Sequence, residues 1–370
     1  MTTPLAPARK ALTAAGRSPV TGPFLIMFLV AIGAALTTPR FANGGNLRNL
    51  GLEVAIVSIV AIGSTFVILT AQIDLSPGAV IAVTSIVTAV LLKNSGFGLG
   101  ATLVMVIVMG VVIGLVNGFF CSYGRIPSFI FTLAAMSAYQ GLAYLITGGT
   151  PIFSLPGLGK IFYGSLGVVP YPFVYVVVLY ALAWAYLRYS RGGRKIYAVG
   201  GNEAAARLAG IKVNRVRTRA FVFAGVLSAI AGLLMTAQLD SGAPNYGSGM
   251  ELTGIAAAVI GGTSLFGGRG NVVATFFGAM IITIVQNALN LHAVGTAWQG
   301  ITLGVIIVVA VGIDMWRSAA GHAVLDRVQA LAVTMGLSRP SPEMPTDAGG
   351  TENAPDETER KDQVPPGPRQ

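Results

Sequence analysis

The chain is poor in charged residues. Of its 370 residues, Asp, Glu, Lys and Arg make up 10% and hydrophobic residues 54%, and the mean hydropathy is +0.72. An ordinary soluble domain carries roughly 25% charged residues. Apolar runs close to bilayer length, about 17 to 25 residues, recur along this sequence. The composition therefore excludes a soluble globular protein and indicates an all-α polytopic membrane protein.

Residues that support covalent, metal or nucleotide chemistry are also scarce. The single cysteine, Cys121, excludes an internal disulfide and a cysteine metal cluster. His292 and His322 lie too far apart in the sequence to suggest a metal pair. No G-x-x-x-x-G-K-[ST] loop occurs, so this chain is not expected to hydrolyse ATP. Gly262 to Leu265 lacks the G-x-S-x-G nucleophile elbow, and we expect no enzymatic activity and no bound cofactor or metal.

Acidic residues are few within the apolar region. They are Glu53, Asp74, Asp240, Glu251 and Asp314, each near the expected end of an apolar run. A proton- or sodium-coupled carrier generally uses ionisable groups or unwound helices near the bilayer midplane. No such group is evident, so the sequence favours a transporter whose driving energy comes from elsewhere.

The hydropathy pattern predicts about ten membrane spans within residues 23–316. The runs begin near Phe24, Glu53, Gly78, Gly100, Ser128, Val169, Ala220, Leu252, Val272 and Thr296. A cleaved signal peptide is the competing interpretation of the short first run. The polar leader before it, residues 1–22, contains Arg9, Lys10 and Arg17 and fits an anchored first helix at least as well.

The placement of the basic residues predicts the topology. The formal net charge of +10 would suggest a nucleic-acid partner in a soluble protein, but here none is expected. Nine Lys and Arg residues fall in the loop 188–219, whereas only Arg40, Arg48, Lys93 and Lys160 fall in the loops assigned to the outside. Under the positive-inside rule, the loop 188–219 and both termini are expected in the cytoplasm.

The last 54 positions, 317–370, form an expected cytoplasmic tail. Apolar residues at helical spacing predict a helix on the membrane surface over Ala319 to Met335. From Ser338 onward the sequence is rich in Pro, Asp and Glu, and we expect it to be disordered because it cannot bury enough apolar surface.

A short repeat suggests two related halves. TAQID at Thr70 to Asp74 ends the second expected span, and TAQLD at Thr236 to Asp240 ends the seventh. On the predicted topology the first copy lies inside and the second outside, as in the inverted repeats of many transporters. Asn117 and Asn287 fall at similar places in the two halves.

The basic loop contains a short helix with its own caps, expected over 202–210. Asn202 is a good N-cap, and Glu203 places negative charge at the positive end of the helix dipole. Gly210 is suited to the left-handed residue that ends a helix, with Ile211 folding back on the last turn. A helix of about seven residues is marginal alone. A partner protein, anionic lipid, or simple positive-inside charge are the alternatives for what holds it.

Five motifs in a fixed order resemble one family. They are IDLSPG at 73–78, GLVNG at 114–118, IPSFIFTLAAM at 126–136, YAVGGNEAAARLAGIKV at 197–213 and GGTSLFGGRG at 261–270. The sequence resembles permease subunits of ATP-binding-cassette importers of the ribose and related monosaccharide class, from about Phe41 to Trp316. The resemblance implies a type II importer-like permease fold. It departs at Ala71 and Gln72, where the family commonly has glycines, and at Pro77, where it commonly has Val.

The resemblance also implies partners and site residues. Two permease copies would form the path through the inner membrane, an extracytoplasmic protein would deliver the sugar, and a separate ATPase subunit, which binds ATP and Mg, would grip the short helix. The residues implied in ATPase coupling are Gly201, Asn202, Glu203, Ala204, Ala205, Arg207, Leu208 and Gly210. Permeases for nucleosides, branched-chain amino acids or a furanosyl signalling molecule are related, so the cargo stays open.

Polar residues in and between the apolar runs are candidates for the translocation path or gate. They are Asp74, Ser76, Asn117, Ser128, Thr132, Gln140, Gly262, Thr263 and Asn287, with Gln299 as a further path candidate. Structural roles compete with this assignment. Ser76 and Pro77 favour the start of a helix, the glycines of 261–270 permit a sharp turn and close packing, and each polar group is suited to bonding between helices.

Overall fold

The computed structural model describes residues 18–334, with side-chain surroundings for residues 18–316. Residues up to Arg317 form one compact unit and those from Ser318 a second. The fold described below is that of the first unit.

The expected leader and tail are described only in part. Residues 1–17 and 335–370 lie outside the described residues. The final helix, α14, runs over Thr296–Thr334 and so includes most of the helix expected over Ala319 to Met335. Placement of that helix on a membrane surface and disorder beyond Ser338 stay predictions.

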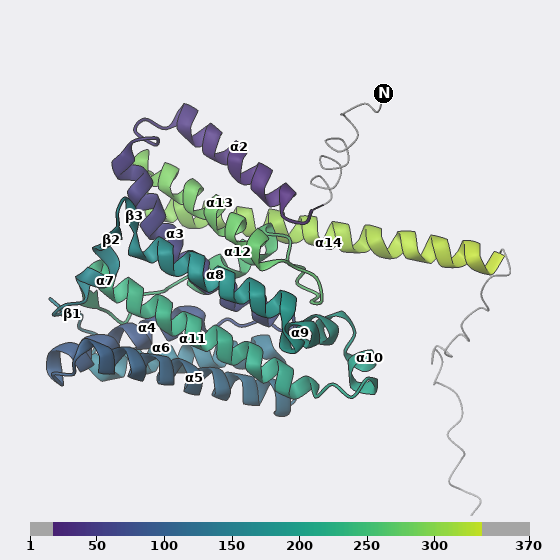
Figure 1. Ribbon diagram of the computed structural model, residues 1–370, viewed down its shortest axis with the longest axis horizontal. Helices are drawn as coiled ribbons and strands as arrows, with labels where there is room; N and C mark the ends of the chain where they lie inside the picture. Colours follow the sequence, from purple (N-terminus) through teal and green to yellow (C-terminus); the bar gives the residue numbers. More distant parts are fainter. Residues whose placement is uncertain (1–17, 335–370) are drawn as a thin grey trace, which may run out of the picture. The chain divides into compact units, whose positions relative to one another are not determined.

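The described chain is helical almost throughout (Figure 1). Its long helices are α2 (Thr21–Thr37), α3 (Gly44–Ile68), α4 (Pro77–Ala89), α5 (Leu99–Tyr123), α6 (Ser128–Thr147), α8 (Tyr171–Tyr189), α11 (Val213–Leu239), α12 (Met250–Ile260), α13 (Val272–Leu291) and α14. The shorter ones are α7 (Gly159–Tyr163), α9 (Arg191–Gly201) and α10 (Glu203–Leu208), and a π-helical turn, Val90–Asn94, extends α4. Strand β1 (Ile152–Phe153) pairs antiparallel with β4 (Ser241–Gly242), and β2 (Ser165–Leu166) with β3 (Val169–Pro170).

Ten apolar helices match the ten expected runs, and eight of them are long and apolar enough to cross a membrane. Helices α2 and α12 are shorter. Helix α3 begins well before the apolar run near Glu53, because Asn43 caps it by accepting a hydrogen bond from the Gly45 amide at 3.0 Å. The polytopic helical fold predicted from the sequence is confirmed.

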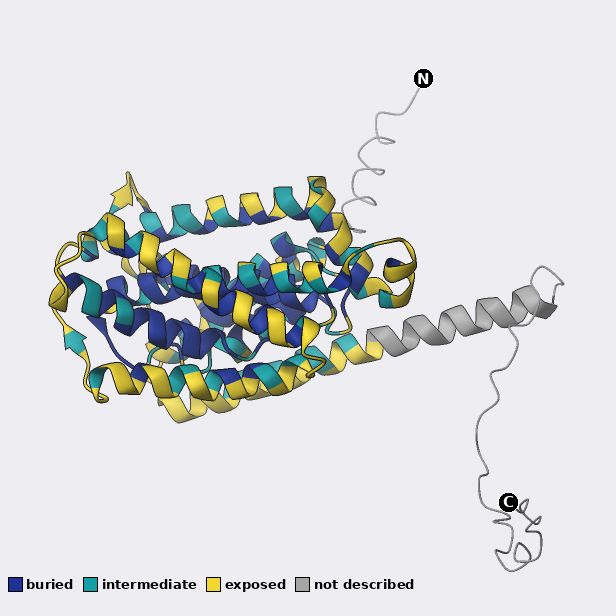
Figure 2. Cartoon of the chain, turned by 90° about the horizontal axis from the view of Figure 1, so that it is seen from below, coloured by how far each residue is buried: buried dark blue, intermediate teal, exposed yellow. Residues whose placement is uncertain are grey.

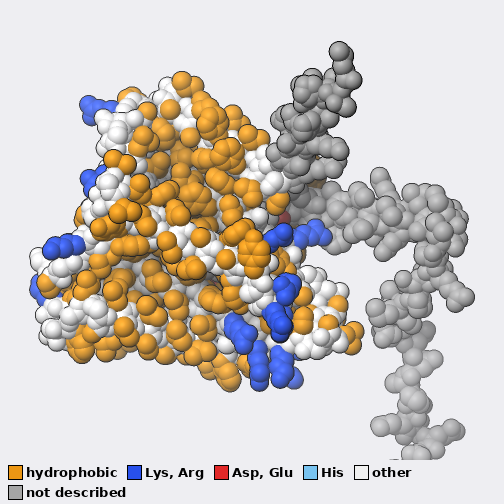
Figure 3. Space-filling view, in the orientation of Figure 1, with side chains coloured by type: hydrophobic (Ala, Val, Ile, Leu, Met, Phe, Trp, Pro, Cys, Tyr) orange, Lys and Arg blue, Asp and Glu red, His pale blue; other side chains and the backbone are white. Residues whose placement is uncertain are grey.

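Helices α3, α4 and α11 form the centre of the unit. The apolar window of α3 is 89% buried, whereas that of α6 is 17% buried. Figure 2 shows this contrast, with buried residues on the inner helices and exposed ones on the outer faces. The exposed residues on the outer helices are largely hydrophobic, as the space-filling view shows (Figure 3). Such an apolar outer surface suits a lipid environment.

A glycine stripe on α5 packs directly against the α11 backbone. Gly110, Gly114 and Gly118 recur every fourth residue. A β-carbon at Gly114 would lie 2.5 Å from the Val222 α-carbon, and one at Gly118 would lie 2.8 Å from that of Thr218. Small residues at this spacing let two helices approach closely. The glycines of the GLVNG motif therefore have a packing role. This packing does not account for the asparagine of the motif.

The two copies of the TAQ repeat end helices that run in opposite directions. Phe66, near the end of α3, contacts Phe223, in the first half of α11, with ring centroids 5.1 Å apart. After each copy the chain leaves the helix before α4 and α12 begin. The two breaks meet inside the unit, where a β-carbon at Gly78 would lie 2.5 Å from the Gly247 carbonyl oxygen. This inverted arrangement with interrupted helices is typical of transporters.

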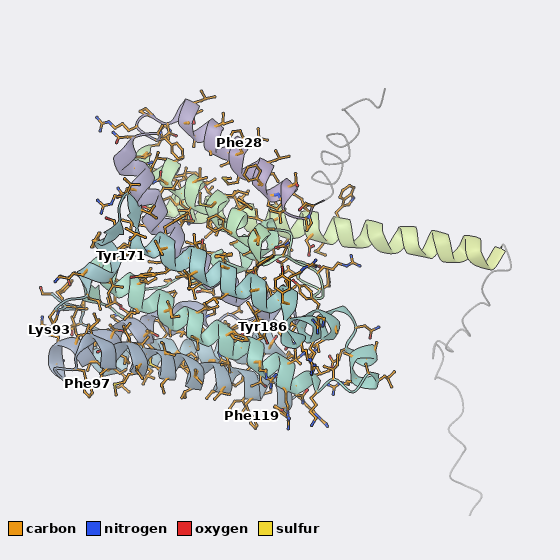
Figure 4. All side chains as sticks on the ribbon, viewed as in Figure 1. Phe28, Lys93, Phe97, Phe119, Tyr171 and Tyr186 are labelled. Atoms are coloured by element: carbon orange, nitrogen blue, oxygen red, sulfur yellow. The ribbon has the colours of Figure 1, made fainter. Side chains whose placement is uncertain are left out.

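The unit has two chemically different ends. Figure 4 shows Tyr171 and Tyr186 toward opposite ends of α8. We name the end with α9, α10 and the start of α11 the basic end, because Lys and Arg gather there (Figure 3). The other end, which includes the four short strands and Lys93, we name the strand end.

Candidate functional sites

Helix α10 is capped at both ends by residues that flank it in the sequence. The Asn202 side chain accepts a hydrogen bond from the Ala205 amide at 2.9 Å, which caps the first turn. Gly210 has a φ of 75°, a conformation that favours glycine. The Ile211 amide donates to the Ala206 carbonyl at 3.0 Å, as in a Schellman motif. Both caps expected from the sequence are confirmed, although the coupling role stays a prediction.

Helix α9 precedes α10 and was not expected from the sequence. Its glycines argue against a helix in the sequence, because each costs about 1 kcal/mol relative to Ala in a helix interior. Tertiary packing explains two of them: a β-carbon at Gly193 would lie 2.6 Å from the Leu187 α-carbon, and one at Gly200 would overlap the Leu69 carbonyl oxygen. The Ser190 side chain caps α9 by accepting from the Gly193 amide at 2.9 Å. Close packing therefore outweighs helix propensity here.

Glu203 ties α10 to the long helix α11. Its carboxylate pairs with Arg207 and with Arg217 of α11, each at 2.6 Å. The hydrogen bond from Arg207, together with that from Arg217, holds the pKa of the Glu203 carboxyl below its ordinary value of 4.5, although partial burial opposes this. Arg217 is mostly buried, with 14% of its side chain exposed. Arg217 is one of several basic residues near α10 in the sequence, and only the fold shows that it is the second partner of Glu203.

The outer face of α10 is open and apolar. Ala204 and Ala205 are exposed, and Leu208 is 90% exposed. Ala206, on the inner side, is 4% exposed. The outer face of α10 therefore presents an uncovered leucine beside small alanines, with no other part of the described chain over it.

The inner side of this region rests on the turn that follows α3. The Leu69 carbonyl accepts a hydrogen bond from the Gly268 amide at 3.1 Å, and Gly200 of α9 packs against the same carbonyl. Tyr197 of α9 donates to the Gly270 carbonyl at 3.0 Å. Helix α9, the glycine-rich loop between α12 and α13, and the end of α3 therefore meet at one point.

The glycine-rich loop is also held from α14. The Asp314 carboxylate accepts hydrogen bonds from the Leu265 amide at 3.1 Å and the Ser264 hydroxyl at 3.3 Å. Gly262 has a φ of 85°, and Thr263 is buried with no hydrogen-bond partner for its hydroxyl. These two candidates lie in the packed loop, apart from the other path candidates.

Two hydroxyls from α6 hold the chain between α3 and α4. The Ser128 hydroxyl accepts from the Ile73 amide at 3.0 Å, and the Thr132 hydroxyl accepts from the Leu75 amide at 3.0 Å. These amides have no helix or sheet partner, so the side chains satisfy groups that would be costly to leave unpaired. The sequence candidates Ser128 and Thr132 thus position the segment on either side of Asp74.

Asp74 begins a chain of polar side chains inside the unit. It is 6% exposed, and its carboxylate accepts from the Ser76 hydroxyl at 2.7 Å. Asn117 of α5 donates to Ser76 at 2.8 Å and accepts from Tyr139 of α6 at 2.8 Å. Ser76 does occupy the N-cap position of α4, but its side chain makes no capping bond because it is turned toward Asp74. Tyr139 was missed, because an aromatic in an apolar run gives no signal of its partner.

We name Asp74, Ser76, Asn117, Ser128, Thr132 and Tyr139 the Asp74 cluster. Gln140, one residue beyond Tyr139, lies apart from it and donates to the Pro244 carbonyl. Asn287 pairs reciprocally with Asn46, at 2.9 and 3.1 Å. The two asparagines of the repeat therefore belong to different networks.

The acidic residues do not all lie at helix ends. Glu53 was expected near the end of a span, but α3 starts at Gly44 and places it well inside the helix. Asp74 is buried between two helices. Within the described residues, no group of three or more His, Cys, Asp and Glu side chains is placed to hold a metal ion.

A polar cleft joins α10 to the Asp74 region. Its volume is about 710 Å³, and residues 71–73, the end of α5 and the start of α6 line it together with Arg207 and Arg217. The cleft separates α10 from the start of α6.

Comparisons with known proteins show the family to which the chain belongs. Residues 46–311 match the family described as "Branched-chain amino acid transport system / permease component". The ribose import permease protein RbsC of Bacillus subtilis (strain 168) is 39% identical over 305 residues, which cover 80% of this chain and 93% of the relative. RbsC of Escherichia coli (strain K12) is 37% identical over 324 residues, covering 85% and 99%.

A xylose transport system permease protein, XylH of Haemophilus influenzae, is 32% identical over 351 residues, covering 78% of this chain and 94% of the relative. No solved structure matches the chain. The family match runs from the first turn of α3 into α14 and includes α9, α10 and the Asp74 cluster. The chain therefore belongs to the family described as the permease component of branched-chain amino acid transport systems.

Proposed function

We propose that this chain is the membrane permease subunit of an ATP-driven, binding-protein-dependent importer that carries a monosaccharide across the bacterial inner membrane. The observation that carries the proposal is α10, a doubly capped helix with Leu208 90% exposed on its outer face. A separate ATPase subunit that binds ATP and Mg docks on this face. Permeases named for ribose and xylose among the relatives favour a sugar as cargo.

The proposed coupling proceeds by rigid-body motion. When the ATPase moves α10, the ion pairs of Glu203 carry the displacement to α11, and the Gly200 contact carries it to Leu69. Leu69 leads into the segment that Ser128 and Thr132 hold. Helices packed as one body move together, so the segment around Asp74 acts as the gate.

The proposed assembly comprises two copies of this permease in a lipid bilayer, the ATPase, and an extracytoplasmic sugar-binding protein. The basic end faces the cytoplasm, because Lys and Arg are in excess there and such an excess favours the cytoplasmic side. Both chain termini then lie in the cytoplasm. Cargo is selected mainly by the binding protein, so importers of branched-chain amino acids, nucleosides or a furanosyl signalling molecule are the alternative.

Reconstitution tests the proposal. The full chain is placed in liposomes with its ATPase subunit and binding protein, and uptake of labelled ribose, xylose, leucine and adenosine is measured with and without ATP. We expect uptake of a sugar that requires ATP and all three proteins. Uptake by the chain alone under an ion gradient would contradict the proposal, and uptake of leucine or adenosine in place of the sugars would establish the alternative cargo.

A further inference from the structure

A wholly apolar groove lies between α8 and α13. It has a volume of about 270 Å³ and is lined by Val176, Val177, Tyr180, Ala181, Trp184, Val273 and Phe276. The hydroxyl of Tyr180 points away into the core, where it donates to the Ser58 carbonyl at 3.1 Å. Val177 is 51% exposed and Trp184 41% exposed. The groove therefore opens on the outer surface of two membrane-spanning helices.

The α8 side of the groove continues along the helix to Arg188. Val177, Ala181, Trp184 and Arg188 follow one another at spacings of four, three and four residues, which places them on one face of α8. Trp184 stands edge to face with Tyr189, with ring centroids 5.4 Å apart. Trp and Tyr are enriched at the membrane interface, so this pair marks the depth of the lipid headgroups.

Near the groove, at the basic end of the unit, three arginines have no acidic partner among the described residues. Arg188 and Arg191 are exposed. Arg269, also exposed, precedes α13 on the other side of the groove. Both ion pairs among the described residues belong to Glu203 and involve none of these arginines. These arginines are therefore open to an anion at the level where the apolar lining ends.

We propose that this groove is a binding site for an anionic phospholipid. An acyl chain fills the apolar lining, and the phosphate lies against Arg188 and Arg191. Long basic side chains at helix ends bind anionic headgroups in this way. The cargo and the ATPase do not match the groove, because a sugar has no apolar chain and the proposed ATPase face is the outer side of α10. This inference goes beyond the proposed function and does not depend on the cargo.

Native mass spectrometry of the full-length chain in detergent tests the site, with phosphatidylglycerol and phosphatidylcholine of identical acyl chains as probes. We expect preferential retention of phosphatidylglycerol. Combining Arg188→Gln with Arg191→Gln should weaken its retention about fivefold for each arginine, since each contributes on the order of 1 kcal/mol near an anionic surface. Ala181→Trp, which fills the groove from its open side, should reduce retention of both lipids.

Matched controls separate the site from general lipid coating. Lys160→Gln removes an exposed cation at the strand end, and Leu182→Trp enlarges an exposed residue next to Ala181 but outside the groove. Neither should change lipid retention. Equal retention of the two lipids, or equal losses in the controls, would overturn the proposal. So would efficient cross-linking of Ala181→Cys to a second copy, because the groove would then be a protein interface.

Discussion

Replacing Leu208 with Asp is expected to weaken binding of the ATPase subunit strongly and to reduce the ATP hydrolysis that the loaded binding protein stimulates. Leu208 is 90% exposed and makes no contribution to the core of its own chain. A hot-spot residue of an interface contributes about 2 kcal/mol or more, and the aspartate would in addition bury an unpaired charge, so affinity should fall more than about tenfold. Co-purification of the ATPase and its rate of ATP hydrolysis in liposomes measure the effect.

The matched control is Val168→Asp. Val168 is an equally exposed apolar residue, 95% exposed, but it lies in the hairpin at the strand end. This variant should insert into the membrane and bind the ATPase as the unmodified chain does. Ala205→Trp should reproduce the loss, because it places a bulky group on the same face of α10. Unchanged ATPase binding in Leu208→Asp would remove α10 from the interface.

Gly200→Val is expected to destabilise the basic end and uncouple ATP hydrolysis from transport. A β-carbon at Gly200 would overlap the Leu69 carbonyl oxygen and lie 2.6 Å from the Gly268 nitrogen. These are backbone atoms, so the clash is relieved only by separating α9 from α3. Overpacking of this kind costs about 1 to 3 kcal/mol or more. A lower thermal unfolding temperature, with residual ATP hydrolysis that no longer drives uptake, is the expected result.

Its control is the next glycine. Gly201→Ala adds a β-carbon that meets nothing within 4 Å, and alanine is the better helix former. This variant should unfold at the same temperature as the unmodified chain or slightly higher. If Gly200→Val behaved in the same way, the contact at Leu69 would not be tight enough to carry motion toward the gate.

The sequence predicted local structure correctly where a residue and its hydrogen-bond partner are close in the chain. The caps of α10 are of this kind, because Asn202 and Gly210 bond within a few residues of themselves. The starts of most apolar helices were also predicted, because the hydropathy of each span is evaluated without reference to distant segments. The order of five motifs identified the family.

What the sequence did not predict depends on contacts between distant segments. Helix α9 was missed because its glycines disfavour a helix, and only the fold shows that Gly193 and Gly200 pack against the backbone at the ends of α8 and α3. Ser76 was expected to cap α4, yet Asn117, from another helix, and Asp74 determine where its hydroxyl points. Likewise, the similar placement of Asn117 and Asn287 in the two halves gave no information about their separate partners.

The central claim is that α10 is a cytoplasmic surface covered by an ATPase. Thiol labelling of Leu208→Cys tests it most directly, in a Cys121→Ser background that removes the native cysteine. A membrane-impermeant reagent should label the residue in inverted vesicles and not in intact cells, and bound ATPase should protect it. Labelling in intact cells, or equal labelling with and without the ATPase, would contradict the account.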